Sequence, residues 1–324
     1  MRILVTGGAG FIGAALSESL LDDGHAVAGV DNLNDYYDPA LKRARLERLE
    51  GREGFAFHRL DLADAEALTA LIADFQPEIV VNLAAQAGVR YSLVNPRAYV
   101  QSNLVGFANL LEACRAHPPA HLVYASSSSV YGASRRIPFA LDDPADQPVS
   151  FYAATKRANE HMAYCYSHLY GFPATGLRLF TVYGPRGRPD MAYFDFTRRI
   201  LAGEPLTLFD ADGEPRRDFT YIDDILAGIR AVMERPPKGD GGAPHRLFNL
   251  GNDSPAGVRE MVSLLERFLG REAEIVSKPL PPGDVPETWA DISDACRELD
   301  YDPSTSLEQG LERFVAWYRE FYNG

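Results

Sequence analysis

A tyrosine and a lysine four residues apart are the pair in this sequence best suited to proton transfer. Tyr152 and Lys156 lie in the run Tyr-Ala-Ala-Thr-Lys on a segment with helical spacing, so they share one face of the helix. A phenol with a pKa near about 10 is a poor base, but a neighbouring ammonium favours phenolate. Tyr152 is therefore a candidate general base. Because such pairs also occur by chance on surface helices, their context must support this interpretation.

A serine-rich loop supplies hydroxyl groups upstream of this pair. Residues 125–132 read Ala-Ser-Ser-Ser-Ser-Val-Tyr-Gly and follow a predicted strand. Open α/β sheets bind ligands at the carboxyl ends of their strands, and a hydroxyl there can assist proton transfer. A serine run is also typical of a solvated turn. The absence of a Gly-x-Ser-x-Gly motif argues against a serine hydrolase.

Three glycines are spaced so that the backbone can approach a phosphate. Gly7, Gly10 and Gly13 lie between a predicted strand and a predicted helix. A pyrophosphate can bind at the positive N-terminus of such a helix, although the glycines alone are also consistent with a simple tight turn. The spacing indicates a dinucleotide site only together with further residues.

Two carboxylates end the next two predicted strands. Asp31 follows Gly13 by 18 residues, where a carboxylate can accept hydrogen bonds from the ribose hydroxyls of adenosine. Since an anion there would repel a 2′-phosphate, NAD is favoured over NADP. Asp61 is placed for an adenine contact, or equally for capping the helix that follows it.

Alternating strands and helices must position these groups. Strands are predicted at Arg2 to Thr6, Ala26 to Asp31, Phe55 to Asp61, Ile79 to Ala84, His121 to Ser126 and Ala174 to Phe180. Helices are predicted at Phe11 to Leu21, Ala65 to Phe75, Pro96 to His117, Tyr152 to Tyr170, Met191 to Ala202, Asp223 to Glu234, Gly257 to Leu269 and Ser306 to Tyr322. We therefore predict an α/β fold with a Rossmann-type doubly wound parallel sheet in residues 1–182. A smaller α/β substrate lobe is expected in residues 183–324, with some segments crossing back.

Composition narrows the class of protein. The 324 residues are 46% hydrophobic, which excludes disorder, and the net charge of −13 argues against nucleic-acid binding. No apolar run reaches the length of a membrane span, so no membrane partner is expected. Three scattered cysteines and seven unclustered histidines favour neither a disulfide framework nor a metal site. The expected compartment is a reducing cytoplasm.

These residues resemble the motifs of a known family. The glycine loop of residues 7–13, Asp31, the Tyr152 and Lys156 pair and the serine run are similar to those of the extended short-chain dehydrogenase/reductase family, in particular its NAD-dependent nucleotide-sugar epimerases. The resemblance covers nearly the whole chain.

Three further stretches resemble UDP-glucuronate 4-epimerases more narrowly. They are Asp31 to Lys42, Arg216 to Asp224 and Pro282 to Val285. The resemblance implies reversible epimerisation of UDP-glucuronate to UDP-galacturonate at C4. NAD would take a hydride from C4 while Tyr152 takes the O4 proton, and the 4-keto sugar would turn before the hydride returns. It also implies a homodimer.

The resemblance assigns roles to individual residues. Tyr152, Lys156 and Ser127 are the expected catalytic residues, although any of Ser126 to Ser129 remains open as the catalytic hydroxyl. The expected NAD contacts are Gly7, Gly10, Phe11, Ile12, Gly13, Asp31, Asn32, Asp61, Leu62, Leu83, Ala84, Ala85, Gln86, Asn103, Tyr152, Lys156 and Phe180. The expected UDP-sugar contacts are Arg90, Ser127, Ser128, Ser129, Tyr152, Thr181, Arg188, Arg217 and Asp284.

Related reactions are separated by the chemistry of a few positions. Ser128 and Ser129 stand where dehydratase relatives carry an acidic pair, which favours epimerisation. Pro281 replaces an arginine of galactose-epimerase relatives, which leaves the diphosphate contacts open. A UDP-glucose or UDP-N-acetylglucosamine 4-epimerase, a nucleotide-sugar dehydratase and a catalytically silent NAD-binding regulator remain as alternatives. Because the substrate is an anion, Arg90, Arg188 and Arg217 are expected to form a positive pocket.

Overall fold

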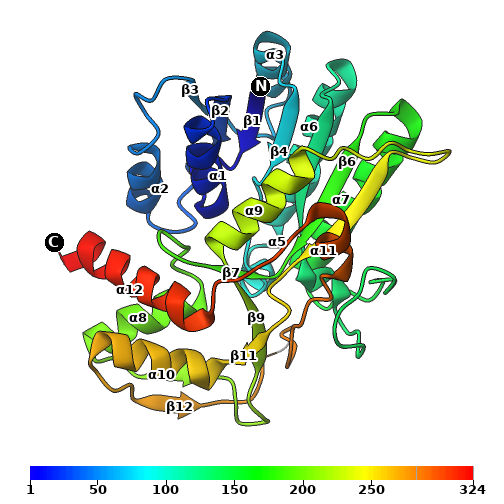
Figure 1. Ribbon diagram of the computed structural model, residues 1–324. Helices are drawn as coiled ribbons and strands as arrows, with labels where there is room; N and C mark the ends of the chain where they lie inside the picture. The colour runs from blue at the N-terminus through cyan, green and yellow to red at the C-terminus, as the bar shows by residue number, and fades with distance from the viewer. Residues whose placement is uncertain (282, 324) are drawn as a thin grey trace.

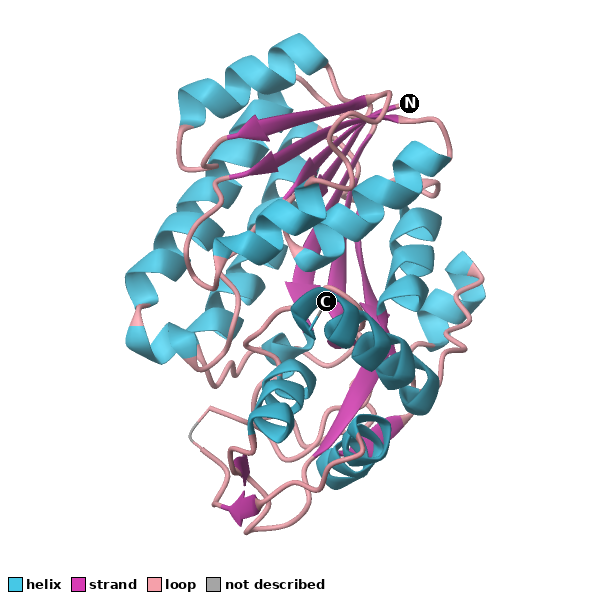
Figure 2. Ribbon diagram, turned by 90° about the vertical axis from the view of Figure 1, so that its left-hand side faces the viewer, coloured by secondary structure: helices cyan, strands magenta, loops and turns pink. Residues whose placement is uncertain are grey.

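A seven-stranded parallel sheet forms the centre of the computed structural model, which describes residues 1–281 and 283–323 (Figures 1 and 2). The strand order is β10-β6-β5-β4-β1-β2-β3. Its strands are β1 (Arg2–Thr6), β2 (Ala26–Asp31), β3 (Phe55–Arg59), β4 (Ile79–Asn82), β5 (His121–Ser127), β6 (Ala174–Leu179) and β10 (His245–Leu250). Without β10, the spatial order β3-β2-β1-β4-β5-β6 is that of the dinucleotide-binding doubly wound fold. The prediction of an α/β fold is confirmed.

Helices cover both faces of the sheet because its strands are apolar on both sides. In β1, Ile3 and Val5 face one hydrophobic cluster and Leu4 faces the other, and all three are fully buried. Burying such a side chain stabilises the fold by about 1.5–3 kcal/mol. Helices α1 (Phe11–Asp22) and α9 (Ile222–Met233) belong to the first layer; α3 (Ala65–Phe75), α6 (Gly106–Ala116) and α7 (Phe151–Tyr170) belong to the second.

The C-terminal part of the chain builds a smaller mixed region below the sheet in Figure 1. Its helices are α8 (Ala192–Ala202), α10 (Val258–Leu269) and α12 (Leu307–Asn323), whereas α11 (Ser293–Leu299) packs against β10 and α9 of the larger part. Its short strands are β7 (Thr181–Tyr183), β8 (Leu206–Leu208), β9 (Arg216–Tyr221), β11 (Pro255–Gly257) and β12 (Ile275–Ser277). Strand β10 and helix α9 come from beyond residue 182 yet belong to the large sheet and its covering layer. A domain boundary at residue 182 stays a prediction.

The helix predicted for Pro96 to His117 is interrupted, and that prediction was wrong. The segment forms α5 (Pro96–Tyr99), a π-helical stretch η1 (Val100–Val105) and then α6. A π-bulge displaces the side chains of one turn and often accompanies a functional site. Here the buried side chain of Asn103 lies inside that turn.

Several short elements were not predicted. They are α2 (Pro39–Leu46), α4 (Tyr91–Val94), the 3₁₀ turn η2 (Ser128–Tyr131), α11, β10 and the short strands of the C-terminal part. A signal for α2 was present, because the Asp38 carboxylate accepts from the Ala40 amide and Pro39 occupies the first helical turn. Among the described residues, no helix combines the length and apolar character needed to cross a bilayer.

Candidate active site

A cavity of about 1040 Å³ opens at the carboxyl ends of the sheet strands. Its walls come from the loops after β1, β2, β3, β4, β5 and β6 and from the C-terminal part. Every predicted site residue lines this cavity except Asn103. Of the stretch Pro282 to Val285, Pro282 lies outside the described residues, whereas Asp284 lines the wall. Residues far apart in sequence therefore meet in one site.

The glycine loop leaves the start of α1 open to the cavity. Gly7 has φ +69°, and a Cβ on Gly13 would lie 2.1 Å from the Gly7 carbonyl oxygen, so side chains are excluded from the turn. Gly10 precedes the helix without a side-chain cap, and no acidic residue lies in the first turn. The free N–H groups and the positive end of the helix dipole are therefore available to an anion.

Asp31 is held rigidly beside this loop. Its carboxylate accepts from the Leu33 amide at 2.8 Å and from the Ala9 amide at 3.3 Å, and it pairs with the Lys42 ammonium at 3.4 Å. The side chain is nearly buried, yet it lines the cavity. A fixed carboxylate at the end of β2 is suited to accept hydrogen bonds from ribose hydroxyls.

Asp61 does not cap the helix that follows it. The cap of α3 is Asp64, whose carboxylate accepts from the Ala67 amide, so the capping interpretation of Asp61 was wrong. Asp61 instead accepts from the Asn32 side-chain amide at 2.9 Å and from the Ala63 amide at 2.9 Å. Asn32 and Asp61 thus form a polar pair at the edge of the cavity.

Tyr152 lies at the start of α7, where the Ser150 hydroxyl caps the helix. Burial raises the pKa of the Tyr152 phenol, whereas a hydrogen bond with Ser127 and the positive charge of Arg188 lower it. The sequence pointed to Lys156 as the activating cation, whereas the groups that lower the pKa of Tyr152 in the structure are Ser127 and Arg188. A tyrosine with these neighbours can exchange a proton with a hydroxyl in the cavity.

Lys156 is buried one turn further along α7. Its ammonium donates to the Ala125 carbonyl oxygen at 2.8 Å, at the end of β5. Burial lowers the pKa of Lys156 to about 8. The side chain reaches the cavity from the same helix face as Tyr152, so it can place a positive charge beneath a bound cofactor.

The structure separates the serines that the sequence left open. The Ser126 hydroxyl donates to the buried Glu160 carboxylate at 2.6 Å, so Ser126 belongs to the structural core of the loop. Ser127 points the other way, toward Tyr152, and its hydroxyl donates to the Ser129 hydroxyl at 3.2 Å. The alternating faces of β5 thus favour Ser127 as the hydroxyl beside the base.

Asn103 is a supporting residue behind the cavity wall. Its side chain accepts from the Gln86 amide at 2.8 Å and donates to the Gln86 carbonyl at 3.1 Å and the Thr155 hydroxyl at 3.0 Å. The residue is buried and does not line the cavity, in contrast to the expected direct NAD contact. The π turn brings its amide to the loop after β4, which makes Asn103 a brace for Gln86.

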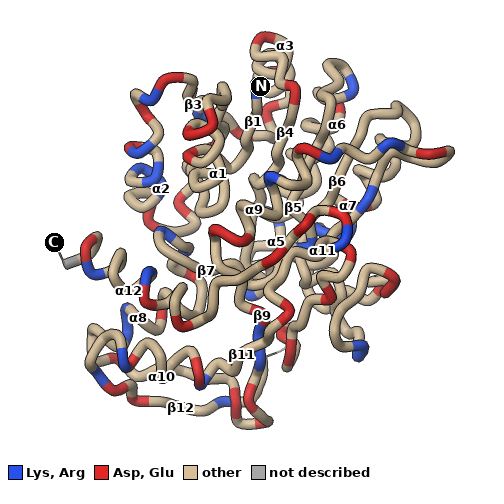
Figure 3. The backbone as a smooth tube through the Cα atoms, in the orientation of Figure 1, with Lys and Arg blue, Asp and Glu red and all other residues tan. Residues whose placement is uncertain are grey.

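The three predicted arginines do not form a purely positive pocket. Arg90 pairs with Asp284 at 2.7 Å, and Arg188 pairs with Asp190 at 3.0 Å. Arg217 donates to the carbonyl oxygens of Arg216 and Pro286. Counted over the described part of the chain, the cavity lining contains six Lys and Arg residues and five Asp residues, so that expectation is corrected. Figure 3 likewise shows both signs of charge interspersed along the chain.

Comparisons with known proteins agree with this site. Residues 3–251 match the NAD dependent epimerase/dehydratase family. The chain belongs to this family. "UDP-glucuronate 4-epimerase 4" of Arabidopsis thaliana is 50% identical over 100% of this chain and 76% of its own length. "Protein CapI" of Staphylococcus aureus is 48% identical over 99% of both chains.

A solved structure extends the likeness from sequence to fold. A UDP-glucuronic acid 4-epimerase from Bacillus cereus, in complex with UDP-glucuronic acid and NAD, superimposes with a TM-score of 0.92. It is 36% identical, and the match covers 99% of this chain and 100% of that one.

The cavity of this epimerase/dehydratase family member fits NAD. The glycine turn excludes side chains in front of α1, and the Asp31 carboxylate lies at the end of β2. These features match the two ends of an adenosine diphosphate: N–H groups for the pyrophosphate and an acceptor for the ribose. Among the described residues, His, Cys, Asp and Glu side chains form no group of three or more suited to a metal ion.

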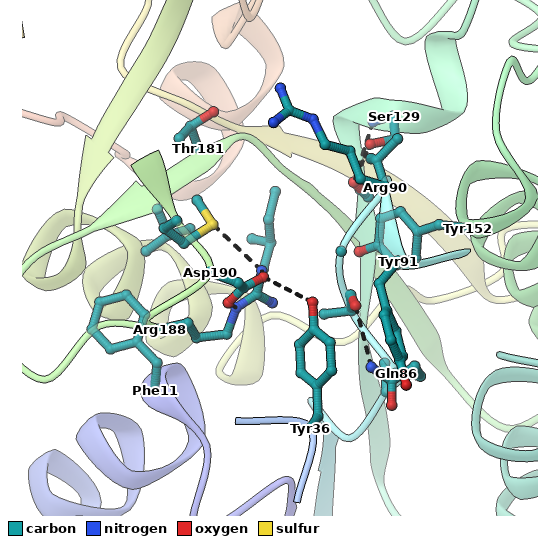
Figure 4. A pocket seen from close by; sticks show the side chains of 18 of the residues that line it. Phe11, Tyr36, Gln86, Arg90, Tyr91, Ser129, Tyr152, Thr181, Arg188 and Asp190 are labelled. Atoms are coloured by element: carbon teal, nitrogen blue, oxygen red, sulfur yellow. Dashed lines mark hydrogen bonds and ion pairs between the residues drawn. The ribbon is translucent and has the colours of Figure 1, made fainter. Parts of the chain in front are cut away.

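Sequence reasoning missed the aromatic wall of the cavity. Tyr36, Tyr91 and Asp190 line it (Figure 4). Ring contacts run from Tyr36 to Tyr91, from Tyr91 to Tyr99 and from Tyr99 to Tyr152. Tyr36 lies within the stretch that resembled UDP-glucuronate 4-epimerases, which was the available signal. Asp190 had no signal beyond its position two residues after Arg188.

Proposed function

We propose that this protein interconverts UDP-glucuronate and UDP-galacturonate by epimerisation at C4, with tightly bound NAD. The observation that carries the proposal is the grouping of Tyr152, Ser127 and Lys156 beside a cavity with a dinucleotide-binding glycine turn. Relatives named as UDP-glucuronate 4-epimerases support the choice of sugar. The cavity lining in residues 1–281 and 283–323 includes no glutamate, which argues against the acid–base pair of a dehydratase.

The protein's own residues supply the proton chemistry. Tyr152 accepts the proton of the sugar O4 hydroxyl and later returns it, while Ser127 hydrogen-bonds that oxygen and holds it near the phenol. Lys156 provides a positive charge that favours the phenolate. NAD, when bound, accepts a hydride from C4 and gives it back to the opposite face of the sugar. Substrate and product are therefore at the same oxidation level.

Other groups hold the sugar nucleotide. Ser128, Ser129 and Thr181 present hydroxyls to the cavity, and Arg188 presents a guanidinium on the same side as Tyr152. Arg90, Arg217 and Asp284 also line the cavity, and we assign them to the nucleotide end. A β-keto acid loses carbon dioxide readily, so hydroxyls that fix the carboxylate would protect the oxidised sugar.

Product analysis tests the proposal. The purified protein is incubated with UDP-glucuronate without added cofactor, and the products are identified by NMR. UDP-galacturonate is expected, since the hydride carrier is regenerated in each turnover. UDP-xylose or an accumulating 4-keto sugar would contradict an epimerase. Faster conversion of UDP-glucose would contradict only the assignment of the substrate.

Adjacent serines should respond differently to replacement. Ser127→Ala is expected to lower kcat about a hundredfold, because one hydrogen bond to the reacting oxygen is lost. Ser126→Ala removes the hydroxyl that donates to Glu160 and is expected to cost about 1–3 kcal/mol of stability with little change in kcat. Steady-state kinetics and urea denaturation of both variants check this. Equal kinetic losses would contradict the assignment of Ser127.

We also propose a cytoplasmic homodimer. Exposed apolar side chains lie on α4, on η1 and at the start of α7, and both α4 and η1 contact α7: Leu93, Val94, Val100, Val105 and Phe151. Clustered exposed apolar groups are typical of an interface. Three free cysteines are compatible with a reducing compartment.

The dimer is tested by mass in solution. Light scattering should give twice the 35.7 kDa of the chain, and Val94→Asp should shift the mass toward that of one chain. Val276→Asp, which changes an exposed valine on β12, serves as the control and should stay dimeric. A wild-type monomer at micromolar concentration would exclude the dimer.

A further inference from the structure

A tyrosine from the cofactor side of the cavity reaches an arginine on the substrate side through one carboxylate. The Tyr36 hydroxyl donates to Asp190 Oδ2 at 3.2 Å. Arg188 donates to the same carboxylate from Nε to Oδ1 at 3.1 Å and from Nη2 to Oδ2 at 3.0 Å. Figure 4 shows Tyr36 rising from its loop toward Asp190, with Arg188 alongside. The three side chains form a continuous polar chain at the cavity wall.

Packing fixes the position of the tyrosine. The Tyr36 ring lies 4.8 Å from the Tyr91 ring, measured between centroids. Gly88 faces the Tyr36 hydroxyl with φ +96°, and a Cβ there would lie 2.5 Å from that oxygen. The loop after β4 therefore leaves a space that the Tyr36 hydroxyl occupies, and Tyr36 has little freedom to move from Asp190.

Residues 32–46, which contain Tyr36 and helix α2, also hold the backbone just before Arg188. Arg45 of α2 is almost fully buried, and its guanidinium donates to the Arg186 carbonyl oxygen at 2.6 and 3.0 Å and to the Gly187 carbonyl oxygen at 2.9 Å. Arg45 also donates to the Ala9 carbonyl in the glycine loop at 3.2 Å. Residues 32–46 thus join the cofactor loop to the backbone immediately before Arg188.

The Asp190 contacts leave part of the Arg188 guanidinium for a ligand. Nε and Nη2 donate to Asp190, and Nη2 also donates to the Met191 sulfur at 3.4 Å, whereas Nη1 donates no hydrogen bond within residues 1–281 and 283–323. Arg188 lines the cavity, and its guanidinium is planar, so fixing one edge determines where the other edge points. The orientation of Asp190 therefore sets the direction of Nη1.

We propose that Tyr36 is a positioning residue that, by holding Asp190, aims the free edge of Arg188 at the sugar of the substrate. This inference rests on the proposed function, in which Arg188 contacts the sugar. Without the Tyr36 hydroxyl, Asp190 loses a donor and can rotate together with Arg188. The segment of residues 32–46 would then help to determine sugar binding, although it lies on the cofactor side of the cavity.

Binding measurements with two ligands test the inference. In Tyr36→Phe, the NAD-loaded enzyme is expected to bind UDP-glucuronate about tenfold more weakly, because a hydrogen bond to a charged group is lost. UDP, which has no sugar acid, is expected to bind as in the wild type. KM for UDP-glucuronate should rise about tenfold with a change in kcat below about threefold. Bound NAD per chain should not change.

A second variant, Asp190→Asn, tests the site through the pH profile of kcat, which a loss of packing alone would not shift. The groups facing Tyr152 are Ser127, Tyr99, Arg188 and Asp190, and Lys156 lies four residues further along its own helix. The Asp190 charge raises the pKa of Tyr152, so Asp190→Asn should lower that pKa. The acid limb of the kcat profile should move to lower pH. A shift in the opposite direction, or none, would contradict the placement of this carboxylate.

Controls separate this inference from the proposed function. Tyr166→Phe deletes a tyrosine hydroxyl that donates to Glu112 outside the cavity, and it should behave as the wild type. If Arg188→Ala leaves UDP-glucuronate binding unchanged, the sugar contact itself is wrong. If Arg188→Ala weakens binding but Tyr36→Phe stays within twofold of the wild type, Tyr36 does not position Arg188. Equal weakening of UDP and UDP-glucuronate in Tyr36→Phe would also overturn the inference.

Discussion

Tyr152→Phe should lower kcat by about a thousandfold and leave the amount of bound NAD unchanged. The phenol is the group beside Ser127 that can remove the O4 proton, and general base catalysis contributes about 10²–10⁴-fold to a rate. The ring of Tyr152 packs near the Tyr99 ring at 6.1 Å between centroids, and phenylalanine keeps that contact. Single-turnover kinetics and absorbance of the cofactor measure the two quantities.

The pH dependence of the rate distinguishes the loss of a base from general damage to the site. The wild-type rate should rise with pH as the Tyr152 phenol ionises, because burial keeps its pKa raised. The variant should lose this rise. A Tyr152→Phe enzyme with more than about a tenth of the wild-type kcat would remove the base assignment.

Glu160→Ala should destabilise the protein by about 3–5 kcal/mol. Glu160 is buried and accepts from Arg178 through both oxygens at 2.9 Å, from Arg157 at 2.5 Å and from Ser126 at 2.6 Å. Removing the carboxylate leaves the charge of Arg178 buried without its partner. The free energy of unfolding from urea titration should fall accordingly.

An exposed pair provides the comparison. Arg136 and Asp142 form an ion pair at 2.7 Å with both side chains more than half exposed. Asp142→Ala should change the free energy of unfolding by less than about 1 kcal/mol. If both variants lost the same small amount, the buried network around Glu160 would not contribute as its geometry indicates.

The sequence could predict groups that depend on local spacing. The glycine turn, Asp31 and the Tyr152 and Lys156 pair all lie within single strand-to-helix units, so a one-dimensional pattern contains their relationship. The alternation of β-branched runs and amphipathic segments was enough to predict the parallel sheet. The break in the helix predicted for Pro96 to His117 could not be predicted in the same way, because the π turn at Asn103 depends on its hydrogen bonds to Gln86 in the loop after β4.

Choices that depend on distant partners could not be predicted. Ser126 and Ser127 are chemically identical, and only Glu160, on another element, shows which one is structural. Arg90 lies next to Asp284 across 194 residues of chain, so the balance of charge in the cavity could not be read from net charge. Strand β10 follows an irregular stretch, and its pairing with β6 became visible only in three dimensions.

Strand β10 is made last among the strands of the large sheet, and this affects how the chain folds. Ala174 pairs with His245, so β6 keeps an open edge during synthesis until the chain has been made through β10. All residues of β6 are buried in the finished sheet, and an apolar unpaired edge is a template for association with other chains. Long-range pairing also slows folding. A fragment ending at residue 182 would therefore expose this edge permanently and should aggregate rather than behave as an independent NAD-binding unit.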